Sequence, residues 1–176
     1  MKNNNINFLE SLILGCNLKI NIFLENTNSS VCTKDFFNNY KISNFWKGKF
    51  FIKRLIKKVF KYKLHKTMIW DNDFWDKVTI DVYNSKINYS DSSLDDFRDN
   101  LEKNMKASRL NDVIKYTEML KKNVNLGNPL YITSECLSLL GANLPNNKFY
   151  ILDGSRRLAS YVLADINPEI LVIDVK

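Results

Sequence analysis

The sequence has a single histidine, three cysteines and no long apolar run. Each of these shortages argues against a class of site or of protein. Any histidine-based metal site or catalytic triad would depend on His65 alone, which lies among lysines. No stretch approaches the ~18–20 apolar residues that a membrane-spanning helix needs. Cys16, Cys32 and Cys136 are far apart and follow no signal peptide, so we expect a cytoplasmic protein without a disulfide framework.

The overall composition is that of a folded globular protein. The chain has 176 residues, of which 45% are hydrophobic and 26% are charged. These values are ordinary for a folded domain, and the length suits one domain with a smaller additional part. We expect an irregular N-terminal segment at 1–46, where apolar pieces alternate with asparagine-rich joints and no single period persists.

The net charge of +7 belongs to one segment. Residues 47–66 contain nine lysines and arginines and no acidic residue, and subtracting those nine from +7 leaves −2 for the rest of the chain. Within this segment apolar residues recur at helical spacing, which predicts a basic amphipathic helix. It suits an anionic membrane surface at the inner leaflet, packing against the domain, or a nucleic acid, which is the least favoured of the three.

From about Val78 onward, strand-like and helix-like stretches alternate. Val78, Ile80 and Val82 are separated by more polar residues, as in a half-buried strand. This alternation predicts an α/β or α+β fold with a mixed sheet and flanking helices over 78–176. The further predicted elements are helices near 97–105 and 110–120, a strand at 130–133, a helical turn at 136–140, a strand at 149–152, a helix at 156–164 and a strand at 170–175.

The turn between the strand at 149–152 and the helix at 156–164 has the residues of an anion site. Gly154 can adopt a positive φ and lets a ligand approach the backbone closely. Ser155 is placed as an N-cap or first-turn hydroxyl of the helix, and Arg156 and Arg157 offer planar donors that suit phosphate. The simpler interpretation is a plain Asp-Gly turn followed by a capping serine and two solvated arginines.

The order of elements around this turn resembles the ParB/sulfiredoxin superfamily over residues 108–175. The residues that carry the resemblance read VIKYTEMLKKNVNLGNPLYIT and KFYILDGSRRLASYVLADINPEILVIDV. Gly154, Arg156 and Arg157 match the turn of the ParB proteins, which bind CTP, although Ser155 replaces a glutamate. Sulfiredoxins carry their working cysteine where Ser155 stands, and a hydroxyl cannot replace that thiolate.

The turn is most similar to that of the free-serine kinases of this superfamily. Asp153, Gly154 and Arg157 match, whereas Ser155 and Arg156 replace histidines. The resemblance implies a nucleotide-dependent phosphotransferase. Together with the basic helix at 47–66, it leads us to expect a small hydroxyl-bearing or saccharide acceptor near the membrane. Its nucleotide would be ATP, ADP or CTP with Mg²⁺. A non-catalytic nucleotide-binding module, and nucleic-acid binding or cleavage, remain alternatives.

The resemblance also implies roles for individual residues. Asp153 and Arg157 would be catalytic, and the nucleotide would contact Gly154, Ser155, Arg156 and Arg109. No protein metal site is expected. The general base would be a second carboxylate, for which the candidates are Asp112, Glu118 and Glu135, and their spacing does not rank them. Each of these acids also suits an ordinary helix surface or a helix cap.

Overall fold

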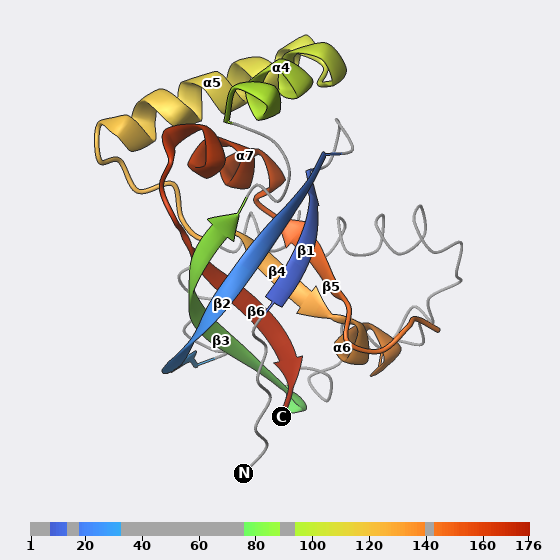
Figure 1. The fold of residues 1–176 in the computed structure, drawn as a ribbon. Coiled ribbons are helices and arrows are strands. Elements are labelled where there is room, and N and C mark those ends of the chain that lie inside the picture. Colours follow the sequence, from blue (N-terminus) through green and yellow to red (C-terminus); the bar gives the residue numbers. More distant parts are fainter. Residues whose placement is uncertain (1–7, 14–17, 33–75, 89–93, 140–142) are drawn as a thin grey trace. The chain divides into compact units, whose positions relative to one another are not determined.

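The computed structural model describes residues 8–13, 18–32, 76–88, 94–139 and 143–176 (Figure 1). The predicted basic helix at 47–66 lies outside these ranges. Within them the chain is a mixed α/β structure with a sheet and flanking helices, as the sequence predicts. Its strands are β1 (Phe8–Ile13), β2 (Leu18–Val31), β3 (Val78–Asn88), β4 (Leu130–Thr133), β5 (Phe149–Asp153) and β6 (Glu169–Val175), and its helices are α4 (Leu94–Asn104), α5 (Ala107–Lys121), α6 (Ser134–Leu139) and α7 (Ser155–Ala164).

Hydrogen bonds join the strands in the order β1-β2-β3-β6-β4-β5. β1 pairs with β2 in an antiparallel register that sets Phe8 opposite Phe23. β4 is antiparallel to β5 and parallel to β6, with Leu130 opposite Leu171. A parallel pair needs a long connection between its strands, which the chain supplies through α6, β5 and α7.

The chain divides into two compact units. One contains β1, α4, α5 and α7, together with the first part of β2 and the second part of β3. The other contains β4, α6 and β5, with the first part of β3 and most of β6. Neither unit is therefore continuous in sequence. The chain passes from the second unit to the first within β3 and again at the turn after β5.

Helix α7 is central to the first unit because six consecutive residues of it are buried. Every residue from Leu158 to Leu163 is buried, and the helix contacts α4, α5 and β1. The small residues Ala159 and Ser160 let α5 approach closely, and the Ser160 hydroxyl donates a hydrogen bond to the carbonyl of Val113 at 3.0 Å. This contact ties the α7 helix directly to the backbone of α5.

The second unit has its own apolar core. Val78 and Ile80 from β3 pack with Ile132 from β4, Leu152 from β5 and Ile173 from β6. Leu137 of α6 is fully buried in the same cluster. The alternation at Val78, Ile80 and Val82 thus corresponds to a real strand, although that strand extends to Asn88.

The structure corrects the expectation of an irregular segment at 1–46, because residues 8–13 and 18–31 form strands. Along β1 exposed and buried residues alternate strictly. The alternation is hidden in the sequence because Phe8 and Leu12 are apolar yet exposed, whereas Ser11 is polar yet buried. Pairing with β2 therefore stabilises β1 as a strand, although the hydrophobic periodicity of its sequence does not predict one.

The α5 helix also buries a different face from the one expected. Val113 and Leu120 are buried as predicted, and Thr117 between them completes the stripe. Ile114, which the sequence pattern assigns to the apolar face, is 45% exposed. Thr117 can replace an apolar residue because its hydroxyl donates a hydrogen bond to the carbonyl of Val113 at 2.8 Å. Among the described helices none is long and apolar enough to cross a membrane.

Candidate functional site

The turn that starts α7 is built on a glycine. Gly154 is the N-cap of the helix and has φ 94° and ψ 13°, in the left-handed region that other residues rarely adopt. A Cβ at this position would lie 3.0 Å from the Cα of Pro129 and 3.2 Å from the guanidinium of Arg157. The positive φ is as predicted, but the space beside the glycine is filled by protein groups.

Arg157 fastens the loop before β4 to α7. Its Nη1 donates a hydrogen bond to the carbonyl of Leu126 at 3.0 Å. Gly127, with φ 77°, lies so close that a Cβ there would be 2.9 Å from the same Nη1 atom. Tyr161, one turn further along α7, reaches the carbonyl of Gly127 at 3.5 Å. Arg157 is therefore held as a structural clamp on this loop.

Burial raises the pKa of the Tyr161 hydroxyl, and the nearby positive charge of Arg157 partly offsets this. Tyr161 therefore stays protonated at neutral pH and can donate to the Gly127 carbonyl. Sequence analysis missed both Tyr161 and Leu126 as parts of this corner. Gly127 gave a usable signal, because a glycine in a short connection often marks a positive φ.

Arg156 has a different environment from Arg157. It forms an ion pair with Asp112 of α5, and the two side chains are 49% and 40% exposed. Arg109 lies one helical turn before Asp112 in α5 and is also exposed. Residues three apart on a helix lie on the same side. The structure thus brings Asp112 and Arg156 together at the first turn of α7, and Arg109 lies on the same side of α5 as Asp112.

The remaining residues of the predicted turn lie at its two ends. Asp153 is exposed at the end of β5, where it is opposite Leu130 of β4. Ser155 is the first residue of α7 and is half-buried. Of the two positions expected for Ser155, the N-cap is occupied by Gly154, which has no side chain to cap the helix, and Ser155 takes the first-turn position.

Two of the three candidate bases lie elsewhere. Glu118 is exposed on α5, about two turns beyond Asp112. Glu135 belongs to the second unit, where its carboxylate accepts hydrogen bonds from the backbone N–H of Asn147 at 2.8 Å and from the hydroxyl of Ser134 at 3.0 Å. Burial acts to raise the pKa of Glu135, but these hydrogen bonds outweigh it and lower the pKa. Glu135 is thus a structural acceptor, and Asp112 is the candidate beside the turn.

The second unit holds a buried polar network that sequence analysis missed. Asp174 is 7% exposed and accepts hydrogen bonds from the Thr133 hydroxyl at 3.0 Å and from the N–H of Val175 at 2.8 Å. Thr133 in turn accepts from the N–H of Cys136 at 3.3 Å. Burial raises the pKa of the Cys136 thiol to about 12, so this cysteine is not a nucleophile at neutral pH. Among the described residues, no group of three side chains could hold a metal ion.

Comparison of the chain with protein-family models, with curated proteins and with solved structures gave no match.

Proposed function

We propose that the chain binds the phosphates of a nucleotide at the first turn of α7 and transfers a phosphoryl group to a small hydroxyl-bearing acceptor, such as a saccharide. The observation that supports this proposal is the ion pair between Arg156 and Asp112, because both side chains are about half exposed. Such a surface pair is worth little in water, so a doubly charged phosphate can replace the carboxylate on the guanidinium.

Two further features favour an anion at this surface. The N-terminus of an α-helix carries the positive end of the helix dipole, and its first backbone N–H groups point outward. Arg109 adds a second guanidinium on the side of α5 that carries Asp112. Arg157 would support the ligand indirectly, by holding the turn against the loop at Leu126.

The carboxylates of this region suit a nucleotide that arrives with Mg²⁺. Magnesium usually keeps several waters and takes only one or two protein carboxylates besides the phosphates. Asp153 is exposed and directly precedes Gly154, so it fits such a ligand or a group that orients the acceptor. In phosphoryl transfer the metal neutralises the charge that develops on the phosphate, and the protein mainly positions the groups. Asp112, once released by Arg156, is the carboxylate we assign to accept the proton of the acceptor hydroxyl.

A second candidate function is nucleotide binding without turnover. It is favoured by the clamp at Arg157, because the Nη1 donor that bonds to the Leu126 carbonyl is not available to a transferred phosphate. In that case the turn would act as a nucleotide-dependent interaction surface. The two candidates agree about binding and differ only in whether the nucleotide is consumed.

A binding screen followed by a turnover assay tests the proposal. The intact chain is titrated with ATP, ADP, CTP and inorganic phosphate, each with and without Mg²⁺, by thermal shift and calorimetry. A nucleotide that binds is then incubated with free serine and a panel of sugars, and phosphorylated product is followed by mass spectrometry. Binding with product supports phosphotransfer, whereas binding without product for any acceptor or for water supports the interaction module.

The variant Arg156→Gln should weaken nucleotide binding by about tenfold, as expected for the loss of a charged hydrogen bond to phosphate. Arg98→Gln is a matched control, since Arg98 is equally exposed and is paired with Asp95 on α4. If neither nucleotide nor phosphate binds the intact chain, both candidate functions are abandoned. Flotation with anionic liposomes, repeated at high salt, separately tests the membrane contact proposed for residues 47–66.

A further inference from the structure

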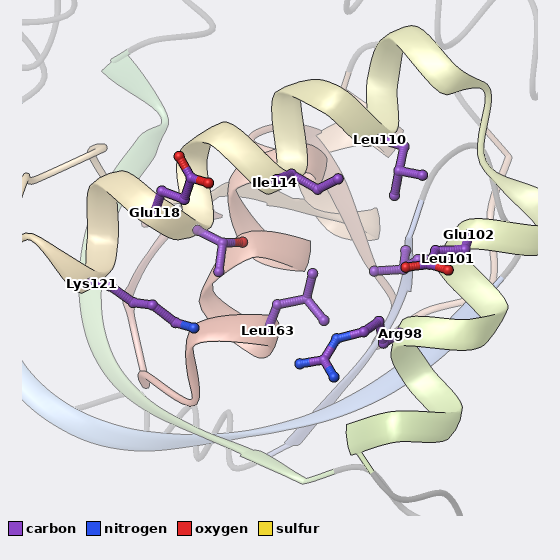
Figure 2. A pocket seen from close by; sticks show the side chains of 9 residues that line it. Arg98, Leu101, Glu102, Leu110, Ile114, Glu118, Lys121 and Leu163 are labelled. Atoms are coloured by element: carbon purple, nitrogen blue, oxygen red, sulfur yellow. The ribbon is translucent and has the colours of Figure 1, made fainter.

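A groove of about 240 Å³ lies between α4, α5 and α7 in the first unit (Figure 2). It is reached at Leu163, near the C-terminal end of α7, whereas the turn at Gly154 lies at the other end of this helix. The groove therefore belongs to a different site from the nucleotide-binding turn. Nothing in the proposed phosphotransfer uses it.

The floor of the groove is hydrocarbon. Leu101 of α4 is fully buried and Leu163 of α7 is 9% exposed. Ile114 of α5 also lines the groove, and its side chain is exposed rather than packed in the core. The methyl group of Thr117 completes this surface, because its hydroxyl is occupied by the Val113 carbonyl. For comparison, a cavity of about 150 Å³ is large enough for benzene, so this groove accommodates an apolar body of roughly eight to ten carbons.

The charges around the groove are not evenly distributed. Its lining contains two cations, Arg98 and Lys121, and two anions, Glu102 and Glu118. Figure 2 shows the ends of Arg98 and Lys121 directed toward each other on either side of Leu163, whereas the carboxylate of Glu118 is directed away from Leu163. The cationic ends of Arg98 and Lys121 therefore lie beside Leu163 on the apolar floor, whereas the four charged side chains of the lining carry no net charge together.

Both cations are available to a ligand. The partner of Arg98 is Asp95, whose side chain is 87% exposed, and a pair of this kind on a helix surface contributes little. Lys121 has no ion pair among the residues that the structure describes. A carboxylate between the two side chains would gain charged hydrogen bonds from both without displacing a buried partner.

We propose that this groove binds a small amphipathic carboxylate, with an alkyl body of roughly eight to ten carbons on Leu101, Ile114 and Leu163 and its head group between Arg98 and Lys121. The apolar lining suits the alkyl body, and the two cationic side chains directed toward each other suit a negatively charged head group. An alkyl amine of the same length would bring a third cation next to Arg98 and Lys121, so we expect it not to bind between them.

The test compares three ligands that differ only in the head group. Octanoate, octanol and octylamine are titrated into the intact chain and followed by calorimetry and ligand-observed NMR. Octanoate should bind at one saturable site, with an affinity about tenfold higher than that of octanol, and octylamine should not bind. Equal binding of octylamine and octanoate, or no saturable binding of octanoate, would overturn the proposal.

Variants assign the binding to the groove. Lys121→Gln and Arg98→Gln should each weaken octanoate binding by about three- to tenfold and leave octanol unaffected. Lys115→Gln is the matched control, because Lys115 is an exposed lysine of α5 that does not line the groove. Ile114→Asp places a negative charge on the exposed part of the floor and should abolish octanoate binding without disturbing the core. If Lys115→Gln weakens binding as much as Lys121→Gln, the head group lies elsewhere and the assignment is incorrect.

Discussion

The guanidinium of Arg157 donates a hydrogen bond to the carbonyl of Leu126, and it also fills the space beside two glycines that have positive φ angles. Gly127 and Gly154 are 27 positions apart in the sequence and are brought to the same side chain. The arginine that the sequence assigns to a phosphate is thus held by the protein itself. Arg156, by contrast, forms an ion pair with the exposed carboxylate of Asp112.

Substitution of either glycine by alanine should destabilise the protein, and Gly154→Ala should cost more. An alanine held at φ 94° costs about 1–3 kcal/mol in backbone strain. Its Cβ would also meet the backbone of Pro129 at 3.0 Å, which cannot move aside, whereas at Gly127 the contact is the tip of a flexible arginine. Urea unfolding of Gly154→Ala, Gly127→Ala and the control Ser155→Ala measures the difference. A larger effect for Gly127→Ala would contradict the packing described for this turn.

The two arginines should differ in their effect on stability. Arg157→Gln removes a hydrogen bond from a half-buried carbonyl and should lower the free energy of unfolding by about 1–2 kcal/mol. Arg156→Gln removes a surface ion pair and should change it by less than about 1 kcal/mol. Chemical denaturation at low and high salt checks both, since only the small effect of Arg156 should depend on salt. Equal losses would mean that Arg157 is not a clamp.

Asp112→Asn should increase nucleotide affinity, because it frees the guanidinium of Arg156 from its present partner. A gain of about two- to fivefold is expected from the loss of a surface ion pair. If Asp112 is also the general base, the same variant should abolish phosphoryl transfer. Calorimetry with ATP and Mg²⁺ measures the first effect, and Glu118→Gln on the same helix is the control. A fall in affinity would show that Asp112 contributes to binding rather than competing with it.

Cys136 should be unreactive in the folded protein. With a pKa of about 12 its thiolate fraction at pH 8 is about one in ten thousand, and the residue is fully buried in the core of the second unit. Iodoacetamide at pH 8 should therefore modify the exposed Cys32 and leave Cys136 unmodified until urea is added. Peptide mass spectrometry distinguishes the two sites. Modification of Cys136 in the native protein at a rate similar to that of Cys32 would contradict its burial.

Asp81→Asn should stabilise the protein at neutral pH. Burial, assisted by the negative charge of Asp174, raises the pKa of Asp81, although the hydroxyl of Thr79 opposes this by hydrogen bonding at 3.0 Å. A carboxyl whose pKa is raised by folding destabilises the folded state once it is ionised in both states, so stability is lost as the pH rises through this pKa. The benefit of asparagine should be present at pH 7 and disappear below the ordinary pKa of aspartate. Melting temperatures of both proteins across this pH range measure the effect, and a benefit that persists at low pH would exclude ionisation as its cause.

The C-terminal elements could be predicted closely because local patterns agree with their environment. The strand at Leu130–Thr133 and the helix at Ser155–Ala164 are bounded by glycine and proline signals, and their apolar residues are in fact buried. The strand at Phe8–Ile13 could not be predicted, because its exposed face carries Phe8 and Leu12. Only pairing with β2 distinguishes its two faces.

The contacts of the site residues could not be predicted from the sequence, because they depend on the tertiary fold. The five residues 153–157 of the predicted turn are contiguous, but Asp112 and Leu126 come from distant parts of the chain. No sequence spacing indicates which arginine each of them would meet. The groove at Leu163 could not be predicted either, because the helical spacing of Ile114 predicts a core residue, whereas its side chain is exposed in the groove.

The amino-acid sequence by itself determined the α/β class, the bounds of most elements after Val78 and the presence of two adjacent arginines at a helix start, because these depend on local conformational preferences and short-range periodicity. The tertiary structure alone decided that Arg157 donates to the carbonyl of Leu126 and that Arg156 pairs with the carboxylate of Asp112. The reason is that a guanidinium bonds to whichever oxygen the folded backbone brings within about 3 Å, and that distance is set by contacts between segments far apart in the chain.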